Sequence, residues 1–559
     1  MKINQLKRWV FTALMSLALV SASDAQAENP YLPTKDVSLY LDAIEKERPN
    51  RKIGSGATGI LVPHHLVAAD LIARGFWAAS EADYDTVILM SPDHFRAVEG
   101  EFATTRASFE TIFGQSQTNQ DHVSTLMGQE DLFELLSAEE LAMEHGFQAV
   151  VPFVKHFFPE AKIVPILASI SAKPKNLQAL ADLVLPMMGP RTLFVQSTDF
   201  SHYLDRRSAV LKDQESISVI AARDADLVVG LEQPRHLDSK ASLTVHMQVQ
   251  KALGAHPLVI ANRNQAEYGG SPDNTTSYVT AVWSKDPSFG YQREFPDQKR
   301  VYFAGDVLLG RYLQDPLTKQ GTTATETVKS LLPKPPDAPF VINLEGVLLD
   351  EIPVGAPNGS HVMVDGIASP LLKGLSVVGA SLANNHTADF GDFGLNETIG
   401  NLNANNIHAM QSGEVYDLGP LRIIPLTLLR NNEPAMSAQA ISENVQKVCN
   451  SAAPPPLIVF IHWGAEWTNT ASQKEHDLAS RFADCGVSAV VGHHSHQASK
   501  HVKAINGGAA QMVYSLGNFI FDQTGPKATG AMLEVTVFNQ STIFSRLVPI
   551  PNFFERLQD

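Results

Sequence analysis

The sequence has little cysteine, a shortage of cations and no long apolar run beyond its first residues. Only two of its 559 residues are cysteine, which excludes a disulfide-rich scaffold and a metal site built mainly from thiolates. Lys and Arg number 43 against 59 Asp and Glu, giving a formal net charge of -16. This charge argues against a general binder of nucleic acid or of anionic membranes. Hydrophobic residues make up 44% of the chain, which is ample for more than one core.

The first residues are typical of a secretory signal peptide. A positively charged segment (2–8) precedes an apolar run over 9–20, and Ala25-Gln26-Ala27 follows as a small-residue cleavage site. We therefore expect residues 1–27 to be removed and the mature protein to be periplasmic or extracellular. No later run reaches the length of a membrane span, so no transmembrane segment is expected after cleavage. An uncleaved N-terminal anchor is the alternative.

Length and pattern predict two α/β domains. A chain of 559 residues exceeds the usual size of one domain. Continuous apolar runs such as 86–90 and 162–168 indicate strands buried on both faces of a largely parallel sheet. Helix-like patterns, among them 180–188 and 216–231, separate these runs.

A polar stretch marks the boundary between the predicted domains. Residues 284–300 contain two prolines and no hydrophobic periodicity, which is typical of a linker. We therefore predict an N-terminal domain over 28–290 and a C-terminal domain over 291–559.

In the C-terminal half, polar clusters directly follow apolar runs. The clusters are Gly305-Asp306, Asn343-Leu344-Glu345-Gly346, Asn384-Asn385-His386, His462-Trp463-Gly464, His493-His494-Ser495-His496 and Ser515-Leu516-Gly517-Asn518. Each cluster alone is typical of an ordinary turn. In open α/β sheets, however, ligands bind beyond the carboxyl ends of the strands, so the ordered set predicts one site at one sheet edge. Its Asp, Glu, Asn and His side chains suit Mn, Zn or Fe ions, which activate water and clamp phosphoryl groups.

The same clusters carry a resemblance to a known family. Their order closely resembles the CapA, or capsule-synthesis PGA_cap, family, which is similar to the calcineurin-like metallophosphoesterase superfamily. The motifs that carry it are GDVLLGR (305–311), NLEG (343–346), LANNHTADFGDFGLNET (382–398), IHWGAEW (461–467), VGHHSHQ (491–497) and YSLGNFIF (514–521).

The resemblance implies a role for each of these residues. Asp306 and His496 would hold one metal ion, and Glu345 would bridge it to a second. The second ion would be held by Asn385, His462 and His494. Two further residues would act on substrate: His386 as the acid that protonates the leaving oxygen, and Arg311 as the binder of an anionic group.

One position departs from the phosphoesterase pattern. Typical phosphoesterases have His two residues after the first Asp, where this chain has Leu308, so the first metal site loses a ligand. The superfamily likeness implies phosphoester hydrolysis, whereas the CapA likeness implies work on poly-γ-glutamate or another envelope polymer.

The two cysteines leave an alternative open. Cys449 and Cys485 each lie late in a predicted helix before a strand. In an oxidising compartment they either pair or stay as two buried free thiols.

The N-terminal half also carries histidines after apolar runs, and it resembles the Memo family, also called AmmeMemoRadiSam system protein B. The motifs, spread over 55–285, are VPHH, SPDHF, EHGFQAVVPF, STDFSHY and EYGGSPDNTTSYVTAVW. That family is similar in fold to class III extradiol dioxygenases. The resemblance implies that His64 and His94 bind a metal, iron or copper, in a cleft lined by Glu144, His145, Asp199 and His202.

This half too departs from its family. A Cys-Gly pair often precedes a helix there, whereas the equivalent region (240–253) contains no cysteine. His246 lies in that region and is a candidate to replace the thiolate. The alternative is a vestigial cleft that binds without redox chemistry, because fold alone does not transfer an activity.

Three functions follow from these patterns. The first is an exported metal-dependent hydrolase acting on an envelope polymer or a small anionic phosphoester, with the Memo-like half binding metal, substrate or a partner. The second is a non-catalytic capsule or envelope assembly factor. The third is redox metal handling by the Memo-like half. Protein partners are not specified by the sequence.

Overall fold

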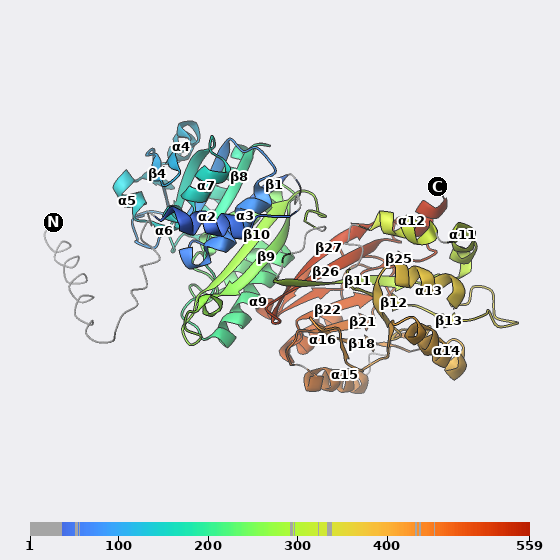
Figure 1. The fold of residues 1–559 in the computed structure, drawn as a ribbon. Coiled ribbons are helices and arrows are strands. Elements are labelled where there is room, and N and C mark those ends of the chain that lie inside the picture. The colour runs from blue at the N-terminus through green and yellow to red at the C-terminus, as the bar shows by residue number, and fades with distance from the viewer. Residues whose placement is uncertain are drawn as a thin grey trace.

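The computed structural model describes residues 36–558 except 51–53, 55, 291–294, 296, 322, 333–337, 431–432, 435–437 and 452. The predicted signal peptide lies outside the described residues. Within them, no helix has the length and apolar character needed to cross a membrane. Two α/β bodies, one from each half of the chain, lie side by side (Figure 1), as the sequence predicts.

The N-terminal body is built on one eight-stranded sheet. Its strands, in spatial order, are β6 (Phe133–Leu135), β3 (Phe102–Thr104), β7 (Lys162–Ala168), β2 (Thr86–Pro92), β8 (Thr192–Ser197), β1 (Ala57–Val62), β10 (Ser277–Ser284) and β9 (His256–Asn264). The four strands β7, β2, β8 and β1 run parallel, as predicted for buried apolar runs. At one edge β10 and β9 run antiparallel, so the sheet is mixed.

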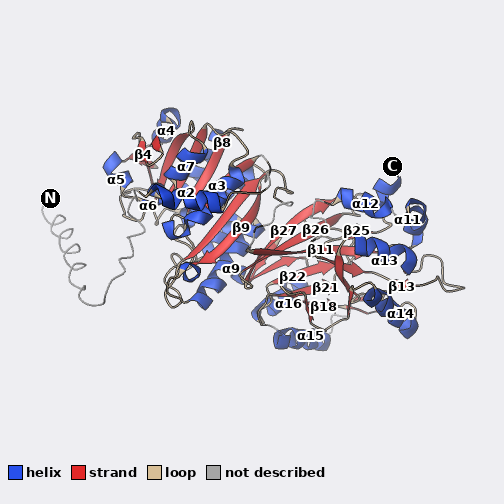
Figure 2. Ribbon diagram, in the orientation of Figure 1, coloured by secondary structure: helices blue, strands red, loops and turns tan. Residues whose placement is uncertain are grey.

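Helices cover both faces of this sheet (Figure 2). On one face α3 packs on β1 and β10, and on the other α10 packs on β8 and β2. The helices are α2 (Val37–Lys46), α3 (Ala69–Ala79), α4 (Gln120–Met127), α5 (Ala138–Ala142), α6 (His145–Gln148), α7 (Val151–Phe157), α8 (Pro174–Val184), α9 (Arg206–Ala222) and α10 (Lys240–Ala252). The helix predicted over 216–231 is wrong in extent. It ends at Ala222 because Arg223 adopts a left-handed φ of 56°, and a separate 3₁₀ turn follows.

The C-terminal body contains two large sheets rather than the single open sheet expected. The first has the order β16 (His408–Met410), β15 (Val377–Ser381), β12 (Phe340–Leu344), β11 (Gln298–Val307), β26 (Gly530–Phe538) and β27 (Thr542–Ile550), with β25 (Asn518–Ile520) paired to β11. The second has the order β17 (Tyr416–Asp417), β18 (Arg422–Thr427), β21 (Leu457–His462), β22 (Ala489–His493), β24 (Ala510–Val513) and β23 (Lys503–Ile505). Their inner faces meet where Phe303 packs against Phe460, with ring centroids 5.7 Å apart.

Helices cover the outer faces of the two sheets (Figure 1). Beside the first sheet lie α11 (Gln314–Gln320), α12 (Thr323–Leu331), α13 (Asp365–Gly374) and α14 (Gly391–Ala404); beside the second lie α15 (Ala438–Ser451) and α16 (Gln473–Asp484). Short elements complete this half: β13 (Val347–Leu349), β14 (Val362–Val364), β19 (Leu429–Arg430), β20 (Glu433–Pro434) and α17 (Phe553–Gln558). In the N-terminal half β4 (Phe109–Thr111) pairs with β5 (Gly114–Ser116).

The predicted linker is fixed to the N-terminal body at its far end. β11 begins at Gln298, so the last residues of 284–300 form a strand. Just before it, the Asp297 carboxylate accepts hydrogen bonds from Arg74 at 2.8 Å and from Arg263 at 2.7 Å. These hydrogen bonds hold the start of β11, the first strand of the C-terminal body, against the N-terminal body.

Helix α9 lies in the interface between the two bodies. It is nearly uniform in polarity around its axis, and its buried Gln214 and Ser218 contact the C-terminal half. The backbone N–H of Ile543 in β27 donates to Gln214 Oε1 at 2.8 Å, and Gln511 Nε2 donates to Ser218 Oγ at 3.3 Å. Because buried polar groups need such partners, α9 binds the two bodies in one specific arrangement.

Replacing Gln214 should weaken this arrangement. In Gln214→Ala the buried N–H of Ile543 loses its partner, so we expect the free energy of unfolding to fall by about 1–3 kcal/mol. Urea unfolding followed by fluorescence measures the change. Gln178→Ala is the matched control, because Gln178 bonds only to Asp182 on an exposed helix face. Equal stability of the two variants would show that the interface bond contributes nothing.

Candidate metal site and the N-terminal cleft

The sequence-predicted site residues of the C-terminal half gather where the strands of both sheets end. Two carboxylates come from the first sheet, Asp306 at the end of β11 and Glu345 directly after β12. The other members end β21 (His462) or follow β15 and β22: Asn385, His386, His494 and His496. The prediction that strand ends converge therefore holds across two sheets.

The Asp306 carboxylate is the most connected group of this site. It accepts a hydrogen bond from Asn343 Nδ2 at 2.8 Å and one from the backbone N–H of His494 at 3.2 Å. His496 Nδ1 lies 3.4 Å from Asp306 Oδ2. Burial alone would raise the pKa of Asp306, but the hydrogen bond and charge of His496 outweigh burial and lower it to about 2. Asp306 is therefore an anion.

Glu345 is a second buried carboxylate beside the first. Burial, and next the charge of Asp306, raise the pKa of Glu345 well above its usual range. Its Oε2 atom is buried and accepts no hydrogen bond. His494 Nδ1 is also buried and has no hydrogen-bond partner. Ligand atoms of Glu345, His462 and His494 all lie within 4.8 Å of one another. Buried oxygen and nitrogen atoms that make no hydrogen bond have lone pairs available to coordinate a divalent cation.

Asn385 and His462 complete this group. Asn385 Oδ1 lies 2.7 Å from His462 Nε2, and His462 Nδ1 lies 2.8 Å from His493 Nδ1. Burial lowers the pKa of His462, and it lowers the pKa of His493 to about 3. Both rings are therefore neutral, which is the form that binds metal.

The first predicted metal position is poorer in ligands. Asp306 and His496 lie there, and His496 Nε2 is 4.0 Å from Glu345 Oε1. Leu308, at the position of the missing histidine, is fully buried in the apolar core. The nearest buried histidine outside the predicted set is His493, whose Nδ1 lies 3.7 Å from Asp306 Oδ1.

Tight backbone geometry holds the histidines that follow β22. His494 and His496 adopt φ values of 91° and 57°, a backbone region that residues other than glycine rarely occupy. A Cβ on Gly305 would overlap the carbonyl oxygen of Gly517, so the Gly-Asp motif needs its glycine for close approach. Strained backbone of this kind persists where the surroundings fix it, as at functional sites.

His386 and Arg311 lie together at the edge of the site. His386 Nδ1 is 2.9 Å from Asp389 Oδ2. Arg311 Nε donates to Asp522 at 2.9 Å, and a second guanidinium nitrogen bonds to the same carboxylate. The Arg311 guanidinium is therefore already paired, and its predicted role in anion binding stays a prediction.

The sequence interpretation missed several site residues. All but Asp522 lie inside the motifs already quoted, so those motifs are the signal that was available. They are Asn343, Asn384, Asp389, His493, Asn518 and Asp522.

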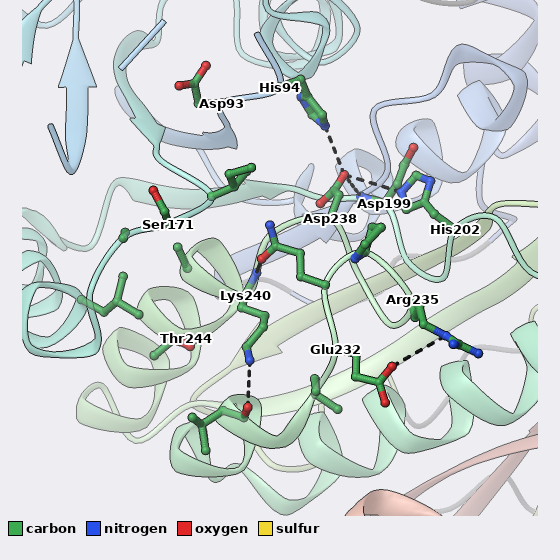
Figure 3. Close-up of a pocket in the computed structure, with 18 of the residues that line it drawn as sticks. Asp93, His94, Ser171, Asp199, His202, Glu232, Arg235, Asp238, Lys240 and Thr244 are labelled. Atoms are coloured by element: carbon green, nitrogen blue, oxygen red, sulfur yellow. Dashed lines mark hydrogen bonds and ion pairs between the residues drawn. The ribbon is translucent and has the colours of Figure 1, made fainter. Parts of the chain in front are cut away.

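The N-terminal half has its own cleft of about 1680 Å³ (Figure 3). All the predicted cleft residues gather in or beside it, four of them after the ends of parallel strands. His64 follows β1, His94 follows β2, and Asp199 and His202 follow β8. The remaining pair, Glu144 and His145, stands at the start of α6.

Imidazole Nε2 atoms converge on a carboxylate that the sequence interpretation missed. His64 Nε2 lies 3.0 Å from Asp238 Oδ2, and His94 Nε2 lies 3.5 Å from it. His202 Nε2 lies 4.0 Å away and has no hydrogen-bond partner (Figure 3). Asp238 directly precedes Ser239, the N-cap of α10, and lies just before the region (240–253) in which the Memo resemblance expects a cysteine.

A second layer of polar groups orients these rings. Ser197 Oγ lies 3.1 Å from His64 Nδ1, and Glu144 Oε1 lies 2.7 Å from His94 Nδ1. Burial would lower the pKa of His94, but its bonds to Asp238 and Glu144 raise it to about 10. Partners on Nδ1 that leave Nε2 directed inward are typical of metal-ligating histidines.

The proposed replacement of the family cysteine by His246 is wrong. Its ring is buried between Phe194 and Trp283, at centroid distances of 4.7 and 4.4 Å. His246 lies two turns into α10 and faces the sheet, whereas Asp238 precedes the helix and reaches the cleft. Helix geometry separates the two residues.

Comparison with known proteins confirms the two resemblances. Residues 34–282 match the family described as Memo-like protein, and residues 300–417 and 423–523 match the family described as bacterial capsule synthesis protein PGA_cap. The N-terminal half is Memo-like and the C-terminal half is CapA-like.

Individual relatives agree with this division. A MEMO1 family protein of Saccharolobus solfataricus is 24% identical over 233 residues, covering 40% of this chain and 81% of its own length. The PGA biosynthesis protein CapA of Bacillus subtilis is 25% identical over 244 residues, covering 40% of this chain and 63% of its own length, which is less than two thirds. Among solved structures, the sulfate thiohydrolase SoxB of Termus thermophilus aligns over 48% of this chain and 60% of its own, at 10% identity and a TM-score of 0.26.

Glu345 should destabilise the metal-free protein. Because its pKa is raised on folding, folding takes up a proton once the pH exceeds the unfolded value near 4.5. Wild-type stability should therefore fall by about 1.4 kcal/mol per pH unit from that point until the folded pKa is reached. Glu345→Gln removes this loss, so the chelator-treated variant should be more stable than wild type at pH 7.5 and similar at pH 4.5.

Thermal unfolding at both pH values in excess chelator measures this difference. Glu326→Gln, on the exposed face of α12, is the control and should track wild type. Equal pH dependence in Glu345→Gln and wild type would contradict the expected cost of the buried carboxylate.

Proposed function

We propose that the C-terminal half is a metal-dependent hydrolase that acts on a phosphoester or on a cell-envelope polymer of the poly-γ-glutamate or capsule type. One observation carries the proposal: two buried carboxylates, Asp306 and Glu345, face three imidazoles and an amide at the ends of strands from both sheets. Two neighbouring buried acids do not stabilise the fold, because the negative charge of each makes ionisation of the other less favourable.

The site residues fit one complete metal position and one partial one. Glu345, Asn385, His462 and His494 would hold a Mn, Zn or Fe ion, and Asp306 and His496 would contribute to a second. A bound divalent cation would supply Lewis acidity and lower the pKa of water. The neutral state of His462 and the anionic state of Asp306 prepare both ligands for this role.

His386 is proposed to donate the proton to the leaving oxygen. Asp389 bonds to His386 Nδ1 and so fixes the tautomer, which leaves Nε2 for proton transfer. The backbone N–H of His386 donates to Asn384 Oδ1 at 3.0 Å, and Asn384 Nδ2 donates to Asn343 Oδ1 at 3.1 Å. This chain of bonds connects the acid to Asn343, which bonds to Asp306.

Work outside the cytoplasm is proposed from two observations. The N-terminal residues have the layout of a signal peptide. Cys449 and Cys485 form a disulfide, the option that an oxidising compartment allows. The CapA relative is a PGA biosynthesis protein by name, which supports a polymer substrate over a small phosphoester.

His386→Ala should remove turnover and spare metal. Loss of a general acid costs about 10²–10⁴-fold in rate, and His386 is not among the proposed ligands. The mature protein is assayed on phosphodiesters and on poly-γ-glutamate, with metal content measured by mass spectrometry. His408→Ala, an exposed histidine of β16, is the control and should keep full activity. Retained metal with no His386-dependent turnover would favour the non-catalytic assembly or binding factor instead.

Redox metal handling by the N-terminal cleft is a second candidate function. The observation that favours it is the convergence of His64, His94 and His202 on Asp238. Imidazoles with one carboxylate suit Fe(II), whereas Cu(I) prefers sulfur ligands. Asp238 Oδ1 is buried with no hydrogen-bond partner, which fits a carboxylate that awaits a cation.

Asp238→Asn should lose the metal of this cleft. The amide removes the negative charge and keeps the shape, so anaerobic Fe(II) binding measured by calorimetry should weaken by about 10-fold or more. The variant is made in a His494→Ala background, which removes the C-terminal site from the measurement. Asp226→Asn changes an exposed carboxylate of the same cleft and should bind as the parent does. Unchanged Fe(II) binding in Asp238→Asn would remove this candidate.

A further inference from the structure

A histidine outside the strand-end motifs lies against the proposed acid. His361 directly precedes β14, on the segment that connects it to β13. Its ring stacks on that of His386, with centroids 3.6 Å apart and planes inclined by 22°. The Phe521 ring is also near His361, with centroids 6.2 Å apart and planes inclined by 48°.

The ion pair of Arg311 holds the His361 ring in place. Arg311 Nη1 lies 3.2 Å from His361 Nε2, while its Nε donates to Asp522 at 2.9 Å. A guanidinium only donates, so His361 Nε2 is the acceptor and the ring is neutral. Burial, aided by His386 and Arg311, lowers the pKa of His361 to about 3.

The backbone at His361 and Val362 lies in close contact with two of the metal-site motifs, NLEG (343–346) and GDVLLGR (305–311). Its carbonyl oxygen accepts a hydrogen bond from Val347 N at 2.8 Å. A Cβ on Gly346 would overlap that carbonyl, and a Cβ on Gly310 would overlap the carbonyl of Val362. The position of the His361 ring is therefore fixed relative to Glu345, which precedes Gly346.

The stacked geometry suits orientation better than coordination. Ligand atoms of His361, His386 and Asp389 lie near enough to one another to suggest a metal. Imidazole lone pairs lie in the ring plane, however, so two stacked rings direct them side by side rather than to one point. His361 Nε2 is also already bonded to Arg311.

We propose that His361 is a positioning residue for His386, and this rests on the proposed hydrolase function. Asp389 fixes the direction of the His386 ring within its plane, and the flat face of His361 blocks rotation of that plane. The two constraints together leave His386 Nε2 in one orientation. Orientation of a reacting group within a few tenths of an ångström has a large effect on rate.

Two variants separate the stacking face from the polar bond. His361→Ala removes the ring, and we expect kcat to fall about 10- to 100-fold with KM and metal content unchanged. His361→Phe keeps a flat ring and loses the acceptor for Arg311, and it should recover most of the lost kcat. An equal fall of kcat in both variants would overturn the proposal, as would a fall in metal content or a kcat in His361→Ala equal to wild type.

Chemical modification tests the same contact without turnover. Diethyl pyrocarbonate modifies accessible imidazole nitrogens, and peptide mass spectrometry follows His386 directly. Removal of the covering ring should raise the His386 modification rate several-fold in His361→Ala and leave it near wild type in His361→Phe. Equal rates in wild type and His361→Ala would contradict the stacking.

The two measurements distinguish failure of this proposal from failure of the hydrolase function. Absence of His386-dependent turnover in wild type would end the hydrolase proposal, and with it the catalytic purpose of the stack. If wild type shows His386-dependent turnover, and the His386 modification rate rises in His361→Ala but not in His361→Phe, the role proposed for His361 is supported.

Discussion

The C-terminal site depends on the burial of the Asp306 carboxylate between the two sheets. Asp306 ends a strand of the first sheet, yet one of its hydrogen-bond donors is the backbone of His494, which follows a strand of the second. A buried charge is costly unless it is paired and hydrogen-bonded, so these partners have to stay in position. The strand ends of the two sheets are in this way tied to one group.

Glu345 is a second buried acid, and one of its carboxylate oxygens has no hydrogen-bond partner. Asp306 has Asn343, His494 and His496 as partners, whereas Glu345 Oε2 has none and lies buried. Protein interiors seldom keep a carboxylate oxygen in that state without a functional reason. The difference between the two acids supports the metal site proposed for Glu345.

Sequence reasoning succeeded where a local pattern decides the structure. An apolar run followed by a polar cluster identified Asp306, His64 and His94, because parallel strands must end at a common edge. It did not divide the C-terminal strands into two sheets, since the same apolar runs fit either one sheet or two. It also missed Asp238 and His361, whose contacts with His64 and His386 join residues distant in sequence. Their positions follow from packing, which no local pattern reports.

The scarcity of cysteine has the same consequence for the candidate sites of both halves. Both cysteines of the chain are used in the Cys449–Cys485 disulfide, which joins the end of α15 to the end of α16. Each candidate metal site therefore relies on nitrogen and oxygen donors alone. In an oxidising compartment, a thiolate in the 1680 Å³ cleft would be open to oxidation, while the Asp238 carboxylate is not. The disulfide, and two candidate sites without a thiolate, both suit the oxidising compartment proposed for this protein.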